Sequence, residues 1–323
     1  METRKLGNSD LQLTRVGFGA WAIGGGGWEF AWGQQEDSDS LAAIVRALEL
    51  GVNWIDTAAV YGTGHSEEIV AQALQQWKGQ RPYVFTKCSL RWDANRKTRQ
   101  EHSAASIRQE CEDSLRRLQS EVIDLYQMHG PPADNGTQLE EAWQAMSDLQ
   151  KQGKVRWIGV SNFAPAQIER AAKIAPVTSD QPPYSLIRRQ IEQDVLPHCL
   201  KHGIGVISYA PMASGLLTGA MTRERAATLP ADDFRSRNPE FKDPKLSKNL
   251  ELVERLRKVA ARHGRGPGEV AIAWVLRHPA ITGAIVGARN AKQAEGVMRA
   301  GELKLTAEEI TEIEGAATAA TAR

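Results

Sequence analysis

Cysteine is scarce in this sequence, and its distribution excludes two classes of protein. Cys88, Cys111 and Cys199 are the only three, and no pair among them has the spacing of metal ligands. An odd number of scattered cysteines argues against a disulfide framework of the kind that secreted domains use. We therefore expect reduced thiols, no metal held by cysteine, and a cytoplasmic protein.

An excess of charge of one sign is also missing. The chain has 40 Lys and Arg residues against 39 Asp and Glu, for a formal net charge of +1. This balance argues against broad electrostatic binding to nucleic acid or to an anionic membrane. No apolar run approaches the roughly 20 residues that span a bilayer, and the first ten residues lack the apolar stretch of a signal peptide. We expect neither a nucleic acid nor a membrane as a partner, and the sequence leaves the oligomeric state open, a monomer included.

Short apolar runs alternate with longer amphipathic segments along the chain. One such segment has apolar residues at Leu41, Ile44, Val45 and Leu48, the spacing of one helical face, with Ser38 as its candidate N-cap. Other predicted helices are 103–118, 139–151, 165–174, 190–202 and 291–300. The predicted strands are 16–21, 52–56, 83–87, 122–128, 155–160, 177–181, 205–209 and 283–287. Eight rounds of strand and helix predict a single α/β domain, a (β/α)₈ barrel over residues 1–323.

Three segments depart from this repeat. Residues 1–15 predict a hairpin with its turn at Gly7-Asn8, placed to close one end of the barrel. The long connection from Tyr209 to Gly283 holds a polar segment, 232–248, followed by extra helices, and it follows the seventh strand on the face where barrel active sites form. Residues 316–323 are small and predict a flexible tail.

Polar side chains stand where the predicted strands end. Asp56, Lys87 and His129 end or follow the second, third and fourth strands, and Tyr61 lies five residues beyond Asp56. Function on a (β/α)₈ barrel lies at the carboxyl ends of the strands, so these groups are expected to converge. Together they suit carbonyl reduction: Tyr61 donates a proton, Lys87 lowers the pKa of the phenol, Asp56 offsets the lysine charge, and a neutral His129 orients the carbonyl oxygen.

Several motifs in register resemble the aldo-keto reductase family over nearly the whole chain, most closely its bacterial inositol-utilisation and general-stress type. The motifs are the segments 51–58 (GVNWIDTA) with Tyr61-Gly62, Thr86-Lys87, Met128-His129, 159–163 (GVSNF), 209–219 (YAPMASGLLTG) and 285–290 (IVGARN). The resemblance implies that Asp56, Tyr61, Lys87 and His129 form a catalytic tetrad.

The resemblance also implies a cofactor site for NADPH. Ser161, Asn162 and Gln181 would bind the nicotinamide carboxamide, and Tyr209 would stack on its ring. The remaining implied cofactor contacts are Ala20, Trp21, Asp56, Pro211, Met212, Gly215, Leu217, Gly287, Arg289 and Gln293. Because Arg289 stands just before a predicted helix, a 2′-phosphate would meet a guanidinium and a helix N-terminus, which favours NADPH over NADH. Trp28 and Trp92 are candidates for the substrate wall.

Two other functions remain open at this stage. A lysine at a barrel strand end can form a Schiff base, so Lys87 could serve a lyase. A chain of this family could also bind the cofactor as a regulatory module without catalysis.

Two further patterns are interpreted as structural. Gly17-Phe18-Gly19-Ala20-Trp21-Ala22 matches the dinucleotide fingerprint G-x-G-x-x-A, but the run Gly24–Gly27 follows where a helix should begin, so we reject that interpretation. His198 and His202 have the i, i+4 spacing of helical metal ligands, yet no glutamate of a metalloprotease motif lies between them. We interpret them as part of a solvated helix and predict no metal.

Overall fold

Eight parallel strands close into a barrel, and they follow one another around it in chain order. The computed structural model describes residues 1–132 and 138–321, with side chains up to residue 315. The barrel strands are β3 (Val16–Gly19), β4 (Trp54–Asp56), β5 (Tyr83–Cys88), β8 (Ile123–Met128), β9 (Val155–Ser161), β10 (Ser179–Gln181), β11 (Gly205–Ser208) and β12 (Ile281–Gly287). The predicted (β/α)₈ fold is thus confirmed, with each strand boundary within two residues of the predicted one.

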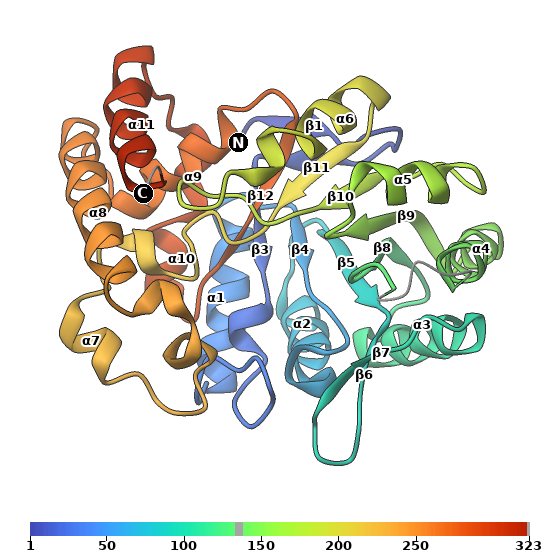
Figure 1. Cartoon of the computed structure of the whole chain (residues 1–323). Helices are drawn as coiled ribbons and strands as arrows, with labels where there is room; N and C mark the ends of the chain where they lie inside the picture. Colours follow the sequence, from blue (N-terminus) through green and yellow to red (C-terminus); the bar gives the residue numbers. More distant parts are fainter. Residues whose placement is uncertain (133–137, 322–323) are drawn as a thin grey trace.

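Helices surround the barrel on its outside (Figure 1). They are α1 (Asp37–Glu49), α2 (His65–Gln76), α3 (Ala104–Leu118), α4 (Gln138–Lys151), α5 (Pro165–Ala172), α6 (Val195–His202), α7 (Arg223–Ala227), α8 (Lys245–Arg262), α9 (Pro267–Leu276), α10 (Ala291–Glu295) and α11 (Ala307–Thr321). Three helices, α7 to α9, lie between the seventh and eighth barrel strands, where the simple repeat has one. None of the described helices combines the length and the apolarity that crossing a membrane requires. The predicted tail at 316–323 lies outside the described side chains.

Several helix boundaries differ from those predicted. Helix α1 begins at Asp37 after Glu36, so Ser38 lies inside the first turn and is not the cap. The predicted helix 190–202 is divided, because the Asp194 carboxylate accepts a hydrogen bond from the Val195 amide and starts α6 there. The predicted helix 291–300 is also divided: α10 ends at Glu295, and a 3₁₀ turn, Met298–Glu302, follows Gly296. Helix α2 and a hairpin formed by β6 (Leu90–Trp92) and β7 (Thr98–Gln100) were not predicted.

The N-terminal hairpin closes the barrel as expected. Strands β1 (Thr3–Lys5) and β2 (Gln12–Thr14) pair antiparallel, and the turn residue Gly7 packs so tightly that a Cβ there would lie 2.1 Å from the Thr178 carbonyl oxygen. Leucines of the hairpin form one apolar cluster with side chains from inside the barrel. Its buried members are Leu6, Leu11, Leu13, Trp54, Phe85, Leu125, Ile207 and Ile285. Apolar side chains therefore fill the amino-terminal end of the barrel and exclude water from it, so a ligand-binding site is expected at the opposite end.

Packing explains the first glycine of the false dinucleotide fingerprint. A Cβ on Gly17 would lie 2.1 Å from the Trp54 indole, which is completely buried and donates its N–H to the Thr14 carbonyl oxygen. Gly17 is therefore required where an inward tryptophan crosses the neighbouring strand, and it lies on β3 rather than at the start of a nucleotide-binding helix.

Candidate active site

A cavity of about 950 Å³ opens at the carboxyl ends of the barrel strands. Most of the predicted site residues line it: Ala20, Trp21, Trp28, Asp56, Tyr61, His129, Ser161, Asn162, Gln181, Tyr209, Pro211, Met212, Gly215, Gly287, Arg289 and Gln293. Among the described residues, the lining does not include Lys87, Leu217 or Trp92. Lys87 and Leu217 are buried behind it. Trp92 lies on β6, where its ring centroid is 6.0 Å from the Arg117 guanidinium.

A buried ion pair lies beneath one end of this cavity. Lys87 Nζ donates to Asp56 Oδ1 at 2.5 Å, to the Thr57 carbonyl oxygen at 2.8 Å and to the Tyr61 hydroxyl oxygen at 3.4 Å. The side chains of Lys87 and Asp56 are 0% and 3% exposed. Because the ammonium has three hydrogens, this set of partners occupies all of them. Burial lowers the pKa of Lys87, and the charge of Asp56 opposes that change.

Two amides complete the surroundings of Asp56. Gln127 and Gln181 donate their Nε2 hydrogens to Asp56 Oδ2, at 3.2 and 2.9 Å, and Gln181 also donates to Gln127 Oε1 at 3.0 Å. Gln127 was missed in the sequence, where nothing distinguishes it from a core residue of β8. The register of the sheet sets Lys87 opposite Gln127, and this pairing brings the amide to the carboxylate.

The pKa of Tyr61 moves opposite to the prediction. Burial raises it well above its ordinary value, and the negative charge of Asp56 adds to the rise, so the nearby Lys87 does not lower it. The reason is that a phenolate in this poorly hydrated position would lose more solvation than one ammonium restores, while that ammonium is already neutralised by Asp56. Tyr61 therefore holds its proton.

A tight backbone contact fixes Tyr61 in place. The 3₁₀ turn Tyr61–Gly64 contains Gly62 at φ 63°, and a Cβ there would lie 2.0 Å from the Gly24 carbonyl oxygen. Only glycine fits this position, because both the left-handed backbone and the contact exclude a side chain. The first glycine of the run at 24–27 is thus packed against the backbone of this turn.

His129 stands beside Tyr61 at the same end of the cavity. The two rings meet edge to face, with centroids 5.7 Å apart. Loss of hydration lowers the pKa of His129 well below its ordinary value, and repulsion by Lys87 adds to this. The imidazole is therefore neutral at neutral pH, and it can donate one hydrogen bond. This agrees with the neutral form expected from the sequence.

Ser161, Asn162 and Tyr209 lie at the middle of the cavity. The Tyr209 hydroxyl donates to Asn162 Oδ1 at 3.0 Å, and burial raises the pKa of Tyr209 to about 12. Asn162 has φ 63° and donates its Nδ2 hydrogen to the His129 carbonyl oxygen at 3.0 Å. The Ser161 hydroxyl donates to the Gln181 carbonyl oxygen at 2.8 Å. These bonds tie the ends of β8, β9, β10 and β11 into one polar floor.

The loop after β11 has an unusual backbone. Ala210, Ala213 and Ser214 have φ values of 54°, 49° and 56°, and Gly215 follows at 87°. Residues other than glycine rarely adopt this left-handed backbone conformation. Clusters of such residues occur where a backbone is shaped for a ligand. Within the described part of the chain, no hydrogen bond uses the amides of Ser214 and Gly215, so both N–H groups are available to an anion.

Arg289 lies at the far end of the cavity, where its guanidinium bonds to a neighbouring loop. It donates to the Trp32 carbonyl oxygen at 3.2 Å, to Gln35 Oε1 at 2.6 Å and to the Gln34 carbonyl oxygen. The helix expected to support a phosphate here is weaker than predicted. Helix α10 is five residues long, and the amides of Gln293 and Arg289 already donate to side-chain oxygens of Asn290 and Gln293.

The sequence did not single out several other residues that line the cavity. Among them are Phe30, Gln34, Gln35, Leu90 and Arg225. Aromatic rings gather at the Tyr61 end, where Trp21 and Trp28 have ring centroids 6.3 and 6.1 Å from that of Tyr61. A carbonyl compound held against Tyr61 would therefore meet flat apolar walls.

The model of one protein family, the aldo/keto reductase family, matches residues 15–318. The chain belongs to the aldo/keto reductase family. This is a family of oxidoreductases that use nicotinamide cofactors. Of the predicted functions, this supports carbonyl reduction in general.

Individual members of the family resemble this chain in sequence or in structure. The chain is 38% identical over 300 residues to aldo-keto reductase YhdN of Bacillus subtilis (strain 168), covering 92% of this chain and 88% of that protein. It is 32% identical over 306 residues to the NADH-specific methylglyoxal reductase of Escherichia coli (strain K12), covering 91% of each. The structure of the glycerol dehydrogenase AKR11B4 from Gluconobacter oxydans superimposes with a TM-score of 0.89 at 38% identity, covering 100% of this chain and 97% of that one.

Proposed function

We propose that this aldo/keto reductase reduces an aldehyde or ketone reversibly to the alcohol, with NADPH as cofactor and Tyr61 as the general acid. The observation that carries the proposal is the contact between Tyr61 and Lys87. Since an ammonium can donate and never accept, the 3.4 Å contact makes the phenol oxygen the acceptor. The phenol hydrogen is then free to donate into the cavity, where a carbonyl oxygen would take it.

The side chains around Tyr61 support proton transfer in this direction. Its raised pKa keeps the hydroxyl protonated until charge develops on the substrate oxygen. The phenolate left behind would lie next to the Lys87 ammonium, which Asp56 holds in place. The neutral His129 would donate a second hydrogen bond to the same oxygen. The nicotinamide cofactor, when bound, supplies the hydride.

The cavity offers contacts for each part of an extended dinucleotide. Asn162 and Tyr209 would meet the nicotinamide end, and the amides of Ser214 and Gly215 would meet the pyrophosphate. At the far end, Arg289 forms no ion pair with any described carboxylate, although its guanidinium is bonded to carbonyl oxygens. Its uncompensated charge favours the 2′-phosphate of NADPH. Glu36 and Asp39 also line that end and would favour a ribose diol, so the preference depends on the balance between these charges.

The cofactor part of the proposal is tested by titrating tryptophan fluorescence with NADPH and with NADH. We expect tighter binding of NADPH, and we expect the variant Arg289→Ala to weaken NADPH about 10-fold to 100-fold while NADH changes little. Arg46→Ala is the matched control, because Arg46 is paired on the surface with Glu49 and Glu295 and lies outside the cavity lining. Equal binding of both nucleotides would overturn the NADPH preference and leave the reductase assignment in place.

The Schiff-base alternative receives no support from the surroundings of Lys87. Its amino group has three partners, its side chain is 0% exposed, and Asp56 and Tyr61 separate it from the cavity. Borohydride treatment with a carbonyl compound is expected to leave Lys87 unlabelled.

A regulatory module would bind the nucleotide without oxidising it. A screen of aldehydes and ketones with NADPH distinguishes this alternative from a reductase.

A further inference from the structure

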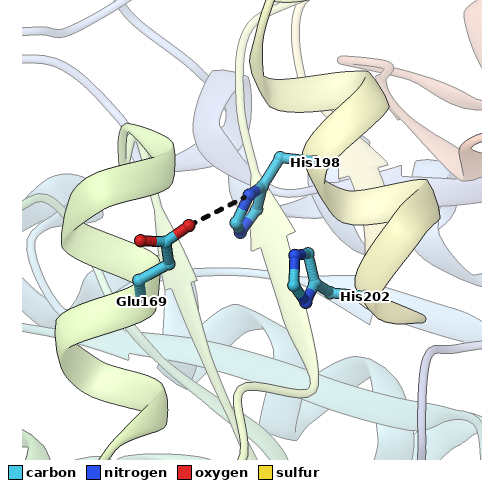
Figure 2. A group of neighbouring side chains, drawn as sticks. All are labelled: Glu169, His198 and His202. Carbon is cyan, nitrogen blue, oxygen red and sulfur yellow. Dashed lines mark ion pairs between the residues drawn. The ribbon is translucent and has the colours of Figure 1, made fainter.

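A second cluster of polar side chains lies away from the cavity, between two outer helices. Glu169 belongs to α5, and His198 and His202 belong to α6. Figure 2 shows the carboxylate and the two imidazoles in the space between these helices, with Glu169 and His198 directed toward each other. The histidine pair alone predicts no metal site, and the third group, from another helix, changes that interpretation.

The distances within this cluster suit a small cation. One nitrogen or oxygen from each side chain lies within 4.8 Å of the other two, and His198 Nδ1 is 3.8 Å from Glu169 Oε1. The two imidazole rings have centroids 4.5 Å apart. Ligand atoms around a tetrahedral Zn²⁺ lie about 3.4 Å from one another, as bond lengths near 2.1 Å require. Closing the cluster therefore takes side-chain movements of about 1 Å, given that geometry.

The side chains have the freedom and the chemistry for this closure. The Glu169 side chain is 62% exposed and can rotate toward the histidines, whereas that of His198 is 11% exposed and is held in place. Burial lowers the pKa of His198, and His202 and Lys201 lower it further, while Glu169 opposes them. A neutral imidazole is the form that binds a metal. Two imidazoles and one carboxylate are ligands that zinc and its neighbours in the transition series accept.

We propose that Glu169, His198 and His202 bind one divalent transition-metal ion of the zinc class, with water at the remaining position. The site is independent of the proposed reductase function, because none of the three residues lines the cavity. The ion would cross-link α5 and α6. These helices follow β9 and β10, the strands that carry Ser161 and Gln181, so the metal would fasten two neighbouring units of the barrel on their outer side.

The test is a calorimetric titration of the full, untagged chain with zinc alone, after treatment with a chelator. We expect one ion per chain. The variants His198→Gln and His202→Gln should each raise the dissociation constant at least about 10-fold, since even the loss of an outer-shell partner costs that much. Glu169→Gln should weaken binding as well. The matched control is His65→Gln: His65 also contacts two carboxylates, Asp37 and Glu68, and should leave the zinc affinity unchanged.

Thermal unfolding gives a second measurement that does not depend on activity. Zinc should raise the melting temperature of the native chain and of His65→Gln, and it should not raise that of His198→Gln or His202→Gln. Melting curves in chelator show whether each variant is folded. The proposal is overturned if the native chain binds no zinc, or if both histidine variants bind it as tightly as the native chain.

Discussion

Two buried aspartates on the barrel strands have opposite surroundings. Asp56 on β4 and Asp180 on β10 are 2% and 0% exposed. Asp56 pairs with Lys87 and accepts hydrogen bonds from Gln127 and Gln181. No hydrogen bond of regular geometry reaches either carboxylate oxygen of Asp180, although the backbone amides of Phe163 and Gln181 lie near it, and among the described residues no cation pairs with it.

Strand alternation accounts for the difference. Gln181 faces the inside of the barrel, so its neighbour Asp180 faces the layer of helices, where Cys199 of α6 lies close enough to sense its charge. Burial raises the pKa of Asp180 to about 8, more than the amides of Phe163 and Gln181 lower it. The comparison shows that this barrel holds an ion pair beneath the cavity, while a carboxyl group elsewhere in its wall takes up a proton near neutral pH.

Removal of the Lys87 cation is expected to have the largest effect on stability and on activity. Lys87→Met leaves Asp56 without a counter-charge, in the situation of Asp180. Loss of one partner of a buried pair costs about 3–5 kcal/mol, so the free energy of unfolding should fall by that amount and carbonyl reduction should be lost. Urea unfolding at neutral pH measures the first quantity.

The control for this experiment removes both charges. Asp56→Asn combined with Lys87→Met should recover much of the lost stability, because it removes the orphaned charge and keeps an oxygen that accepts from the Gln127 and Gln181 amides. The double variant stays inactive. A double variant as unstable as Lys87→Met alone would show that packing at position 87, rather than the orphaned charge, causes the loss.

The variant Asp180→Asn tests whether the Asp180 carboxyl is protonated in the folded protein. A carboxyl whose folded pKa is raised keeps its proton in the folded chain while the unfolded chain loses it, so the native protein loses stability as the pH rises toward about 8. Between pH 6 and pH 8 this loss amounts to about 2 kcal/mol, and the asparagine variant should be spared it.

Urea unfolding between pH 6 and pH 8 measures the free energy of unfolding of the native protein and of Asp180→Asn. Parallel pH curves for the native protein and Asp180→Asn would contradict the assignment of a protonated Asp180. Asp124→Asn provides the contrast. Asp124 pairs with Arg81 and Arg156, so its replacement should not protect the protein against a loss of stability at high pH.

The smallest expected effect concerns His129. Its lowered pKa keeps the imidazole neutral, so kcat/KM for carbonyl reduction should stay level as the pH falls from 8 through the ordinary histidine pKa of 6.5. The sign follows from the direction of the shift, because protonation of His129 is postponed to lower pH. A midpoint at 6.5 that is absent in His129→Gln would show that the imidazole titrates normally and that its surroundings are wetter than the structure indicates.

The sequence predicted the features that depend on strand order and alternation. Asp56, Tyr61, Lys87 and His129 meet because parallel strands bring their carboxyl ends together, and each residue sits next to its own strand. Gln127 could not be found in this way, since its role depends on the register between β5 and β8. The partners of Arg289 come from the loop at residues 32–35, and Glu169 meets His198 across two helices. These contacts arise from packing between distant segments, which no local pattern encodes.

The most direct test of the central claim is a single-turnover measurement of NADPH oxidation by an aldehyde with Tyr61→Phe. The control is Tyr83→Phe, which removes a phenol hydroxyl whose ring packs on Arg156, outside the cavity lining. If Tyr61 delivers the proton, its loss should slow the reaction about 10²-fold to 10⁴-fold while NADPH binding is kept, and Tyr83→Phe should react at the native rate. A Tyr61→Phe variant that turns over at the native rate would contradict the account.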